Sequence, residues 1–256
     1  MRWKGRRHPL RVLRHLEERL QKGKLHMTLV DPEKQPAEVA SDVASSMEDM
    51  GTDAIMVGGS TGITQKNLDT TVKGIKSVVE VPVILFPASA QTISKHADAI
   101  YFMSMLNSRT TRLLVGEQIQ ASKTVKDLGL ETISMGYVVV EPGMRVGEVG
   151  LADPLPRDDP ELAVKYGLAA EFFGMDLFYL EAGSGAPAPV PLEIVSAVGK
   201  EISIPLVVGG GIRNGRSARE LVEAGADILV TGTAVERTRD LASLKEILDA
   251  VKRGSR

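Results

Sequence analysis

The sequence has 256 residues, of which 43% are hydrophobic and 25% are charged, a composition typical of a soluble globular protein that excludes a disordered chain. No apolar run approaches the roughly 18 residues that a membrane-spanning helix requires, and the lack of cysteine excludes disulfides, thiol catalysis and thiolate zinc sites. The formal net charge is −2, but residues 1–24 carry nine Lys and Arg against two Glu, and the acidic remainder disfavours a nucleic-acid enzyme.

The first 23 residues form a basic segment that we predict to be an extra N-terminal helix. Its Leu10, Leu13, Leu16 and Leu20 recur at helical spacing and would face the body of the protein. The alternative is a basic arm that meets nucleic acid or anionic lipid, so peripheral membrane contact stays open. Because the segment has no continuous apolar core, a secretory signal is disfavoured and a cytoplasmic location is expected.

Eight short apolar segments alternate with stretches of helical periodicity along the rest of the chain. Each apolar segment is bounded by Gly, Pro or Asp, as buried parallel strands are. This alternation predicts that residues 24–256 form a (β/α)8 TIM barrel, in a single domain over 1–256, with an open doubly wound sheet as the alternative. The predicted strands are Leu25–Val30, Ala54–Val57, Val83–Phe86, Ala99–Met103, Thr132–Val139, Leu177–Leu180, Leu206–Val208 and Ile228–Thr231. The predicted helices are Pro36–Met50, Gln65–Val79, Thr111–Leu128, Pro160–Phe173, Pro191–Val198, Gly215–Ala224 and Asp240–Lys252.

Two connections depart from the regular pattern. The segment PASAQTISKHAD, between the third and fourth predicted strands, is about as short as a parallel crossover can be, so the third helix is predicted to be stunted or missing. The segment 141–159, rich in Gly and Pro, is too long for a plain connection. We predict that it is a loop that covers the active site.

Glycines follow the last two predicted strands. Gly210 and Gly211 come after the seventh strand, and Gly232 and Thr233 come after the eighth. In barrel enzymes the loops after these strands commonly bind phosphate through backbone N–H groups. Glycine is suited to this task because a Cβ would block close approach of the anion. The pair of motifs therefore predicts a phosphate-bearing substrate.

Side chains at other strand ends indicate the chemistry. Asp31 ends the first strand and Ser60 follows the second, and a carboxylate with a hydroxyl oxygen suits Mg²⁺ that also takes substrate phosphate oxygens. A helix-capping or turn role for Asp31 is the alternative. Tyr179 and Glu181 share one face of the sixth strand, where Glu181 can accept from substrate hydroxyls or assist their deprotonation. A rim carboxylate paired with Arg213 is the alternative for Glu181.

Six of the ten aromatic residues lie near the ends of the third to sixth strands. Ordinary core packing is one interpretation. The other is an apolar groove beside the polar mouth, opened where the third helix is missing, which would suit a long hydrocarbon tail. The residues are Phe86, Tyr101, Phe102, Tyr137, Phe178 and Tyr179.

Several segments together resemble those of the archaeal geranylgeranylglyceryl phosphate synthases, within the prenylglyceryl phosphate synthase family. They occur in the family's order from about Lys24 to the C-terminus, and YLEAGSG and TLVDP distinguish the family from other phosphate-binding barrels. The matching segments are HMTLVDPEK, VGGSTG, VILFPAS, YFMSMLNS, GYVVVEPG, FYLEAGSGAP, VVGGGIRNGRSAREL and AGADILVTGTAVE.

The resemblance implies a Mg²⁺-dependent prenyltransferase of archaeal membrane lipid biosynthesis. It would join sn-glycerol 1-phosphate to geranylgeranyl diphosphate through an ether bond and release diphosphate. Asp31 and Ser60 would bind Mg²⁺, and Asp31 and Glu181 would be the catalytic residues. Glycerol phosphate would be held by Tyr179, Leu180, Glu181, Ala182, Gly183, Ser184, Gly185, Gly210, Gly211, Gly232 and Thr233.

Some details stay open at this level. Lys24, Lys34 and Arg109 are the candidates to bind diphosphate. Bulky Tyr101 and Phe102 near the expected tail path favour the archaeal form over bacterial relatives that use a longer prenyl chain. Another phosphate-binding barrel enzyme, such as a sugar-phosphate isomerase or lyase, is the rival function, and a non-catalytic phosphometabolite-binding protein is a third. A homo-oligomer is expected.

Overall fold

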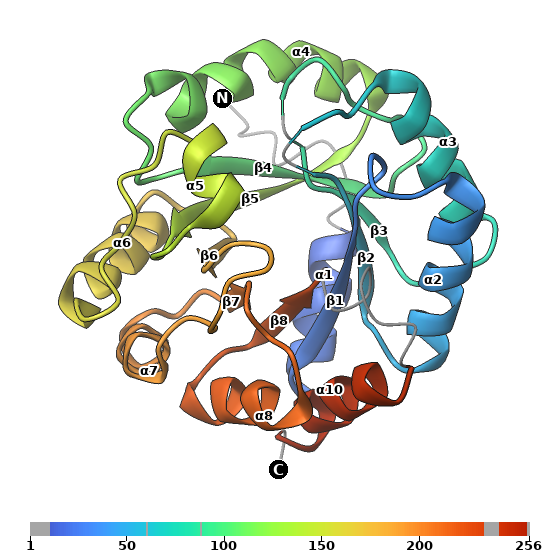
Figure 1. The fold of residues 1–256 in the computed structure, drawn as a ribbon. Helices are drawn as coiled ribbons and strands as arrows, with labels where there is room; N and C mark the ends of the chain where they lie inside the picture. The colour runs from blue at the N-terminus through green and yellow to red at the C-terminus, as the bar shows by residue number, and fades with distance from the viewer. Residues whose placement is uncertain (1–10, 60, 88, 233–240, 255–256) are drawn as a thin grey trace, which may run out of the picture.

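The computed structural model describes residues 11–59, 61–87, 89–232 and 241–254. Its strands are all parallel and close into a barrel in chain order, β1 to β8, with β8 pairing β1 (Figure 1). The predicted TIM barrel is therefore confirmed. The strands are β1 Leu25–Val30, β2 Ala54–Val57, β3 Val83–Leu85, β4 Ala99–Met105, β5 Glu131–Val139, β6 Leu177–Glu181, β7 Leu206–Gly209 and β8 Ile228–Thr231.

Helices surround the barrel, and each predicted helix has a counterpart within a few residues of the predicted ends. Where one helix was predicted over Thr111–Leu128, a π-helical turn precedes the α-helix. In the described part of the segment between β3 and β4 there is only turn structure, so the stunted third connection is confirmed. The helical elements are α1 Arg11–Leu20, α2 Ala37–Asp49, α3 Gln65–Lys76, η1 Arg112–Gly116, α4 Glu117–Leu128, α5 Met144–Val149, α6 Pro160–Phe172, α7 Leu192–Glu201, α8 Gly215–Ala224 and α10 Leu241–Arg253.

The two faces of the strands build two cores. Side chains of one parity fill the barrel interior, among them Met27, Ile84 and Val207. Side chains of the other parity pack outward against the helices, as Leu180 and Val208 do. Burial on both faces explains why the strands are short uninterrupted apolar runs. None of the described helices is long and apolar enough to cross a membrane.

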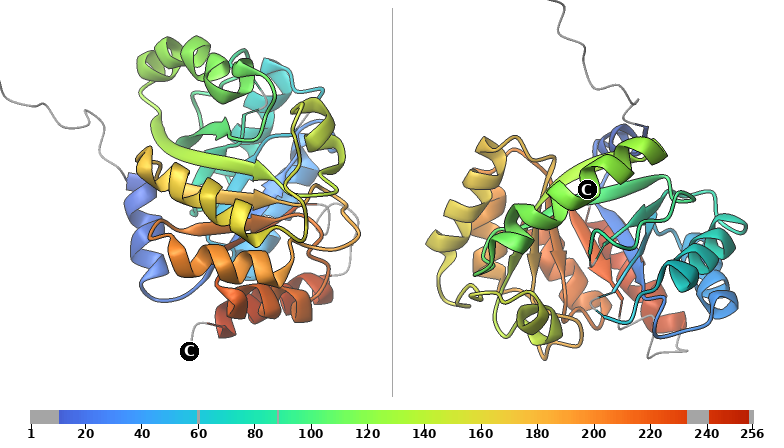
Figure 2. Two further views of the ribbon diagram at one scale, coloured as in Figure 1. Left: turned by 90° about the vertical axis from the view of Figure 1, so that its left-hand side faces the viewer. Right: turned by 90° about the horizontal axis from the view of Figure 1, so that it is seen from above.

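Helix α1 closes the end of the barrel at which the strands begin, here called the base (Figure 2). Leu13 and Leu16 are buried in the interior core, and Leu20 packs against it. The Glu131 carboxylate accepts the first backbone N–H groups of α1 at 2.8–2.9 Å, so a residue of β5 caps the helix. Within the described residues the helix spans Arg11–Leu20, and residues 1–10 of the predicted segment, Leu10 among them, lie outside the described residues.

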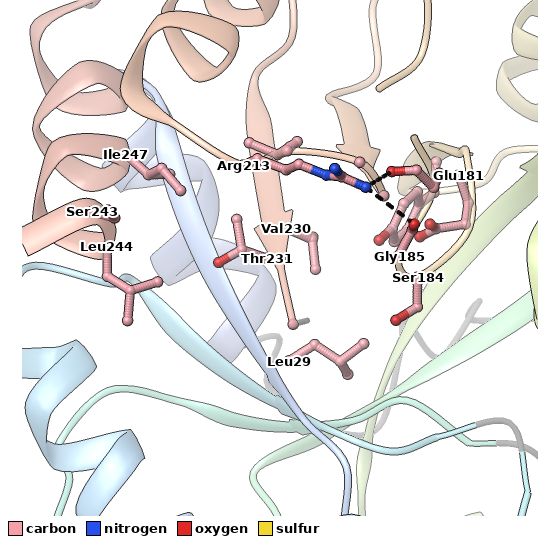
Figure 3. A pocket seen from close by; sticks show the side chains of 16 residues that line it. Leu29, Glu181, Ser184, Gly185, Arg213, Val230, Thr231, Ser243, Leu244 and Ile247 are labelled. Carbon is pink, nitrogen blue, oxygen red and sulfur yellow. Dashed lines mark hydrogen bonds between the residues drawn. The ribbon is translucent and has the colours of Figure 1, made fainter. Parts of the chain in front are cut away.

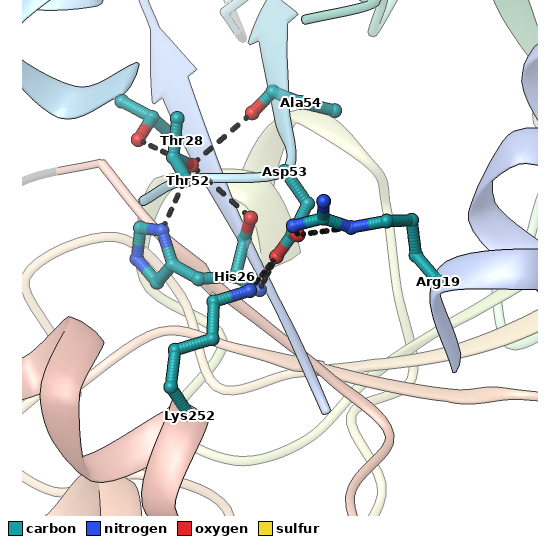
Figure 4. A network of polar contacts seen from close by, with 7 residues as sticks. All are labelled: Arg19, His26, Thr28, Thr52, Asp53, Ala54 and Lys252. Atoms are coloured by element: carbon teal, nitrogen blue, oxygen red, sulfur yellow. Dashed lines mark hydrogen bonds and ion pairs between the residues drawn. The ribbon is translucent and has the colours of Figure 1, made fainter. Parts of the chain in front are cut away.

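A polar network joins α1, β1, β2, β8 and α10 near the base (Figure 4). The fully buried Asp53 carboxylate accepts from Arg19 and Lys252 and from the backbone N–H of His26. The two ring nitrogens of His26 lie 3.0 Å from the Thr52 hydroxyl and 2.9 Å from the Thr231 hydroxyl. Buried polar groups are thus paired with one another here, as their desolvation requires.

The segment 141–159 contains a short helix, α5, where the sequence predicted a loop. It lies at the end of the barrel opposite α1, here called the mouth (Figure 2). Asn107 fastens the segment, because its side-chain amide donates to the carbonyls of Val139 at 2.8 Å and Asp153 at 2.9 Å. The Ser108 hydroxyl adds a bond of 2.7 Å to the Gly150 carbonyl.

Candidate active site

Two adjoining cavities open at the mouth, where the carboxyl ends of the strands gather. One is lined by Gly210 and has a volume of about 270 Å³, and the other is lined by Asp31 and measures about 420 Å³. Both are lined by Glu181, Ser184 and Gly232. The predicted phosphate-binding glycines and the predicted metal ligand Asp31 are therefore at the same end of the barrel.

The smaller cavity is lined by residues at the ends of β6, β7 and β8 and by Leu244 and Ile247 of α10 (Figure 3). Gly210 and Gly211 have φ values of +82° and +70°, which other residues rarely adopt. A Cβ on Gly210 would lie 2.4 Å from Oε1 of Glu181, so a side chain there would displace the carboxylate. Such turns leave room for an anion to approach backbone N–H groups. Thr233, predicted to bind glycerol phosphate, lies outside the described residues.

Glu181 is the buried carboxylate between the two cavities. Its Oε1 accepts the backbone N–H of Gly183 at 2.7 Å, and the Tyr179 hydroxyl also donates to the carboxylate. Burial raises the pKa of Glu181 above its ordinary value, although these two hydrogen bonds act in the opposite direction. The alternative pairing with Arg213 is not what the structure contains, because the Arg213 guanidinium donates to the Ala186 carbonyl at 2.9 Å.

Two residues predicted to bind substrate face away from the cavities. Leu180 and Ala182 are fully buried in the core between the barrel and the surrounding helices. Their neighbours Tyr179, Glu181, Ser184 and Gly185 line the smaller cavity. This alternation follows from the period of two along β6, and it leaves only backbone atoms of Leu180 and Ala182 to act in the site.

The larger cavity contains the predicted metal ligand. Asp31 is 7% exposed, its Oδ1 accepts the backbone N–H of Glu33 at 3.0 Å, and its Oδ2 lies 3.8 Å from Nζ of Lys34. A Cβ on Gly59 would lie about 2.4–2.5 Å from the Asp31 carboxylate, so the end of β2 leaves space beside it. Ser60, the second predicted ligand, lies outside the described residues.

The donor set fits one divalent cation in particular. Within the described parts of the chain there is no cluster of three or more His, Cys, Asp or Glu side chains that could hold a metal by themselves. Mg²⁺ is commonly bound through one or two carboxylates, with waters and substrate phosphates as its other ligands. The carboxylate of Asp31, which lines the larger cavity, is suited to that arrangement.

Cationic side chains around the larger cavity differ from those expected. Lys34 lines it, but Lys24 lies at the base, where its Nζ is 2.8 Å from the Asp227 carboxylate. Arg109 holds the covering segment, with its backbone N–H 2.9 Å from the Leu151 carbonyl. Arg112 and Arg145 line the cavity instead, and the sequence reasoning missed both. Their positions, just after β4 and inside the covering segment, were the available signal.

Apolar side chains form the rest of the wall of the larger cavity. They come from β3 and β4, η1 and α5, and they include Phe86, Met103, Met105, Leu113, Val146 and Val149. A smaller cavity of about 60 Å³ adjoins this wall, beneath α4 and beside the connection between β3 and β4. Tyr101 and Phe102 line it from opposite faces of β4, since Tyr101 belongs to the barrel interior and Phe102 packs outward. An apolar wall therefore lies beside the polar mouth. The alternative of ordinary core packing holds for Tyr101, Tyr137, Phe178 and Tyr179, which are at most 2% exposed.

Comparison with known proteins places this arrangement in a family. The model of the PcrB family matches residues 15–253. The chain belongs to the PcrB family. Geranylgeranylglyceryl phosphate synthase of Pyrococcus horikoshii is 50% identical over 244 residues, which cover 95% of this chain and 96% of the relative. The corresponding protein of Pyrococcus abyssi is 51% identical over 245 residues, with 95% and 97% covered.

A solved structure within the same group is similar over nearly the whole length. The (S)-3-O-geranylgeranylglyceryl phosphate synthase of Thermoplasma acidophilum, in complex with its substrate sn-glycerol-1-phosphate, has a TM-score of 0.92 and 44% identity. The match covers 94% of this chain and 98% of that one. The resemblance inferred from the sequence motifs is confirmed, and with it the expectation of an enzyme of the prenyltransferase class.

Proposed function

We propose that this PcrB-family protein transfers the geranylgeranyl group of geranylgeranyl diphosphate to sn-glycerol 1-phosphate, with Mg²⁺ bound. The observation that carries the proposal is that Glu181 lies between a small glycine-lined cavity and a larger cavity with an apolar wall. The first suits a small phosphate ester and the second suits a diphosphate with a long hydrocarbon tail. The T. acidophilum relative, whose structure contains sn-glycerol-1-phosphate, supports the assignment of the acceptor.

The glycine-lined cavity would bind and orient the acceptor. Backbone N–H groups around Gly210 and Gly211 would bind the phosphate, which fixes the acceptor at one end. The free terminal hydroxyl would then face Glu181, whose carboxylate would accept its proton. A buried carboxylate with a raised pKa is a better proton acceptor than an exposed one, because its pKa is closer to the working pH.

The larger cavity would bind the donor. Asp31, with Ser60, would hold Mg²⁺, which supplies neutralisation of the negative charge that develops on the departing diphosphate. Lys34, Arg112 and Arg145 line the same cavity and would bind the remaining phosphate oxygens. The apolar wall would take the hydrocarbon tail. The segment 141–159 would exclude water, which otherwise competes with the acceptor hydroxyl for the allylic carbon.

The test is an assay with labelled sn-glycerol 1-phosphate and donors of 15, 20 and 35 carbons, with Mg²⁺ and with chelator. We expect ether product and diphosphate release, highest with the 20-carbon donor and abolished by chelation. Asp31→Ala should lower turnover at least about 100-fold, because a Lewis-acid metal contributes several kcal/mol to such a step. Asp42→Ala, which removes an exposed carboxylate of α2, is the matched control and should leave turnover unchanged.

A preference for the 35-carbon donor would contradict the proposed chain length. Diphosphate release without ether formation, or isomerase or lyase activity on a sugar phosphate, would contradict the reaction itself. A homo-oligomer, peripheral membrane contact, the absence of a nucleic-acid partner and a cytoplasmic location stay predictions from the sequence.

A further inference from the structure

Four aromatic rings form one cluster in the barrel interior, one from each of β4, β5 and β6 and one from Phe86, the residue that follows β3. The ring of Phe86 is at its centre, with its centroid 6.1 Å from Tyr101, 5.8 Å from Tyr137 and 6.1 Å from Tyr179. The rings of Tyr137 and Tyr179 are 5.0 Å apart and nearly perpendicular. These separations and tilts are those of aromatic groups that attract one another through their quadrupoles.

Phe86 differs from the other three rings in its exposure. Tyr101, Tyr137 and Tyr179 are at most 2% exposed, whereas Phe86 is only half-buried. Phe86 also lines the larger cavity, whose wall includes both Asp31 and Glu181. It is therefore the ring of this cluster that can present most of its surface to a bound donor.

The position of Phe86 is fixed by its surroundings. The backbone N–H of Phe86 donates to the Val57 carbonyl at 2.9 Å. A Cβ on Gly58 would lie 1.8 Å from the carbonyl oxygen of Phe86, so only glycine fits beside it. Tyr101 packs against the ring almost at a right angle, at 82°. A group held in this way needs little reorganisation when charge develops beside it, which is the condition for strong electrostatic stabilisation.

The reaction proposed above requires such stabilisation between the two carboxylates. The bond between C1 of the donor and the diphosphate oxygen breaks, and the electron pair leaves with the diphosphate. The positive charge is spread over C1 and C3 of the allylic system until the acceptor hydroxyl oxygen bonds to C1 and loses its proton to Glu181. The donor's reacting carbon must therefore lie between the Asp31 and Glu181 sides of the cavity, which Phe86 also lines.

We propose that Phe86 is a catalytic residue whose ring face stabilises the developing allylic cation through a cation–π interaction. The inference rests on the proposed prenyl transfer. A cation within about 6 Å of a ring centroid is attracted by the negative face of the ring. The rings beneath carry no charge of their own, because burial raises the pKa of Tyr137 and Tyr179 well above the ordinary value. The cluster thus acts through ring quadrupoles. Tyr137 lines the same cavity but is only 2% exposed, so Phe86 is the most exposed ring of the cluster.

The alternative is that Phe86 is only a part of the apolar wall, a role that any residue of similar shape could fill. Fluorination separates the two roles, because each fluorine withdraws charge from the ring face and changes the ring volume little. We would therefore replace Phe86 by 4-fluoro-, 3,5-difluoro- and 3,4,5-trifluorophenylalanine in the full chain. Single-turnover rates would be measured with geranylgeranyl diphosphate, sn-glycerol 1-phosphate and Mg²⁺.

We expect the rate to fall stepwise with each fluorine, to about one-tenth with three, in keeping with the usual size of a desolvated cation–π interaction. The dissociation constant of the non-ionising geranylgeranyl thiolodiphosphate should change less than about twofold, since the ground state carries no allylic charge. The same series at Phe172, an exposed residue at the end of α6, is the matched control and should leave the rate unchanged.

Phe86→Leu should lower the rate at least as much as the trifluoro ring and should not be rescued by added apolar volume in Phe86→Met. A flat fluorine series with an active enzyme overturns the role of Phe86 and leaves the proposed function intact. Absence of ether product from the unsubstituted protein overturns the proposed function, and the cation–π inference with it.

Discussion

Each end of the barrel contains a buried carboxylate, and the two carboxylates have different partners. At the base, the fully buried Asp53 carboxylate has two cationic partners, Arg19 and Lys252, and a backbone donor (Figure 4). At the mouth, the Glu181 carboxylate accepts from the Tyr179 hydroxyl and from the backbone N–H of Gly183, and burial raises its pKa. The surroundings at the base therefore stabilise the charged form of Asp53, whereas those at the mouth favour the protonated form of Glu181.

The base of the barrel therefore contributes to stability, and the mouth, at the opposite end, contributes to the reaction. A carboxylate with partners on several sides contributes to the folded state only if it stays charged. A buried carboxylate with a raised pKa is poised to exchange a proton, and the folded state is less favourable for its charged form. Substitutions at the two ends should consequently change different measurable quantities.

The largest effect is expected at the mouth, for Glu181→Gln. Loss of the proton acceptor should lower kcat by about 10²- to 10⁴-fold, the usual contribution of general base catalysis. The free energy of unfolding, measured with urea, should not decrease, because the variant no longer buries a charge. Glu161→Gln, on the exposed face of α6, is the matched control for kcat. A kcat within about twofold of the unsubstituted protein would leave Glu181 a structural residue.

The pH dependence sharpens this first prediction. Because the pKa of Glu181 is raised in the folded protein, its contribution to stability is fully present below the ordinary carboxyl pKa and is lost as the pH rises through the raised value. Activity should change in the opposite sense, falling as the pH drops through the same raised value, because the proton acceptor must be ionised. Glu181→Gln should abolish both dependences, and an unchanged acid limb in the residual activity would contradict the assignment.

The next largest effect is expected at the base, for Asp53→Ala. The substitution leaves the buried N–H of His26 without its acceptor and removes the partner of Arg19 and Lys252. We expect a loss of about 3 kcal/mol in the free energy of unfolding, as for other broken buried pairs. Turnover at a temperature at which the variant is folded should be unchanged. Asp249→Ala, which removes a surface carboxylate paired with Lys245, is the matched control and should lower the free energy of unfolding far less than Asp53→Ala does.

A smaller effect on binding is expected for Gly210→Ala. Its positive φ strains any other residue, and the new Cβ would displace the Glu181 carboxylate. The KM for sn-glycerol 1-phosphate should rise at least about tenfold, a loss of roughly 1.4 kcal/mol in binding. Gly51→Ala is the matched control, since Gly51 also has a positive φ, of +104°, but no atom lies within 4 Å of its Cβ position. Gly51→Ala should lower stability without changing KM, and equal KM values in both variants would contradict the phosphate-binding role.

The strand pattern explains what could be predicted from the sequence. The strands were recognised because burial on both faces makes each one a continuous apolar run, and β1, β2 and β8 have the predicted bounds. The mouth residues Asp31, Glu181 and Gly210 were found because a polar residue or glycine that ends such a run must point to the rim. Both the strands and the residues that follow them can be recognised from the local sequence alone.

The features that were missed depend on contacts between distant segments. Arg112 and Arg145 line the larger cavity from η1 and α5, and the only sign of this in the sequence is their position after β4 and inside the covering segment. Lys24 adjoins β1 but lies at the end where the strand begins, since its partner Asp227 precedes β8. The sequence predicts a loop where α5 lies, because the six residues of α5 contain a glycine and follow Gly143. Val146 of α5 packs against the interior core, and local sequence does not show a contact of that kind.

The smallest effect is expected on the pH dependence of stability, for His26. It allows the base to be compared directly with the mouth. Burial lowers the pKa of His26 to about 3, so the folded protein keeps the ring neutral while the unfolded chain takes up a proton below pH 6.5. Its contribution to stability is present above pH 6.5 and is lost as the pH falls toward 3, by about 1 kcal/mol between pH 7 and 5.5. His26→Gln should make the urea midpoint less dependent on pH in this interval, whereas Glu181→Gln removes a dependence of opposite sign. If the two substitutions change the slope in the same direction, the contrast between a charge-stabilising base and a proton-exchanging mouth is wrong.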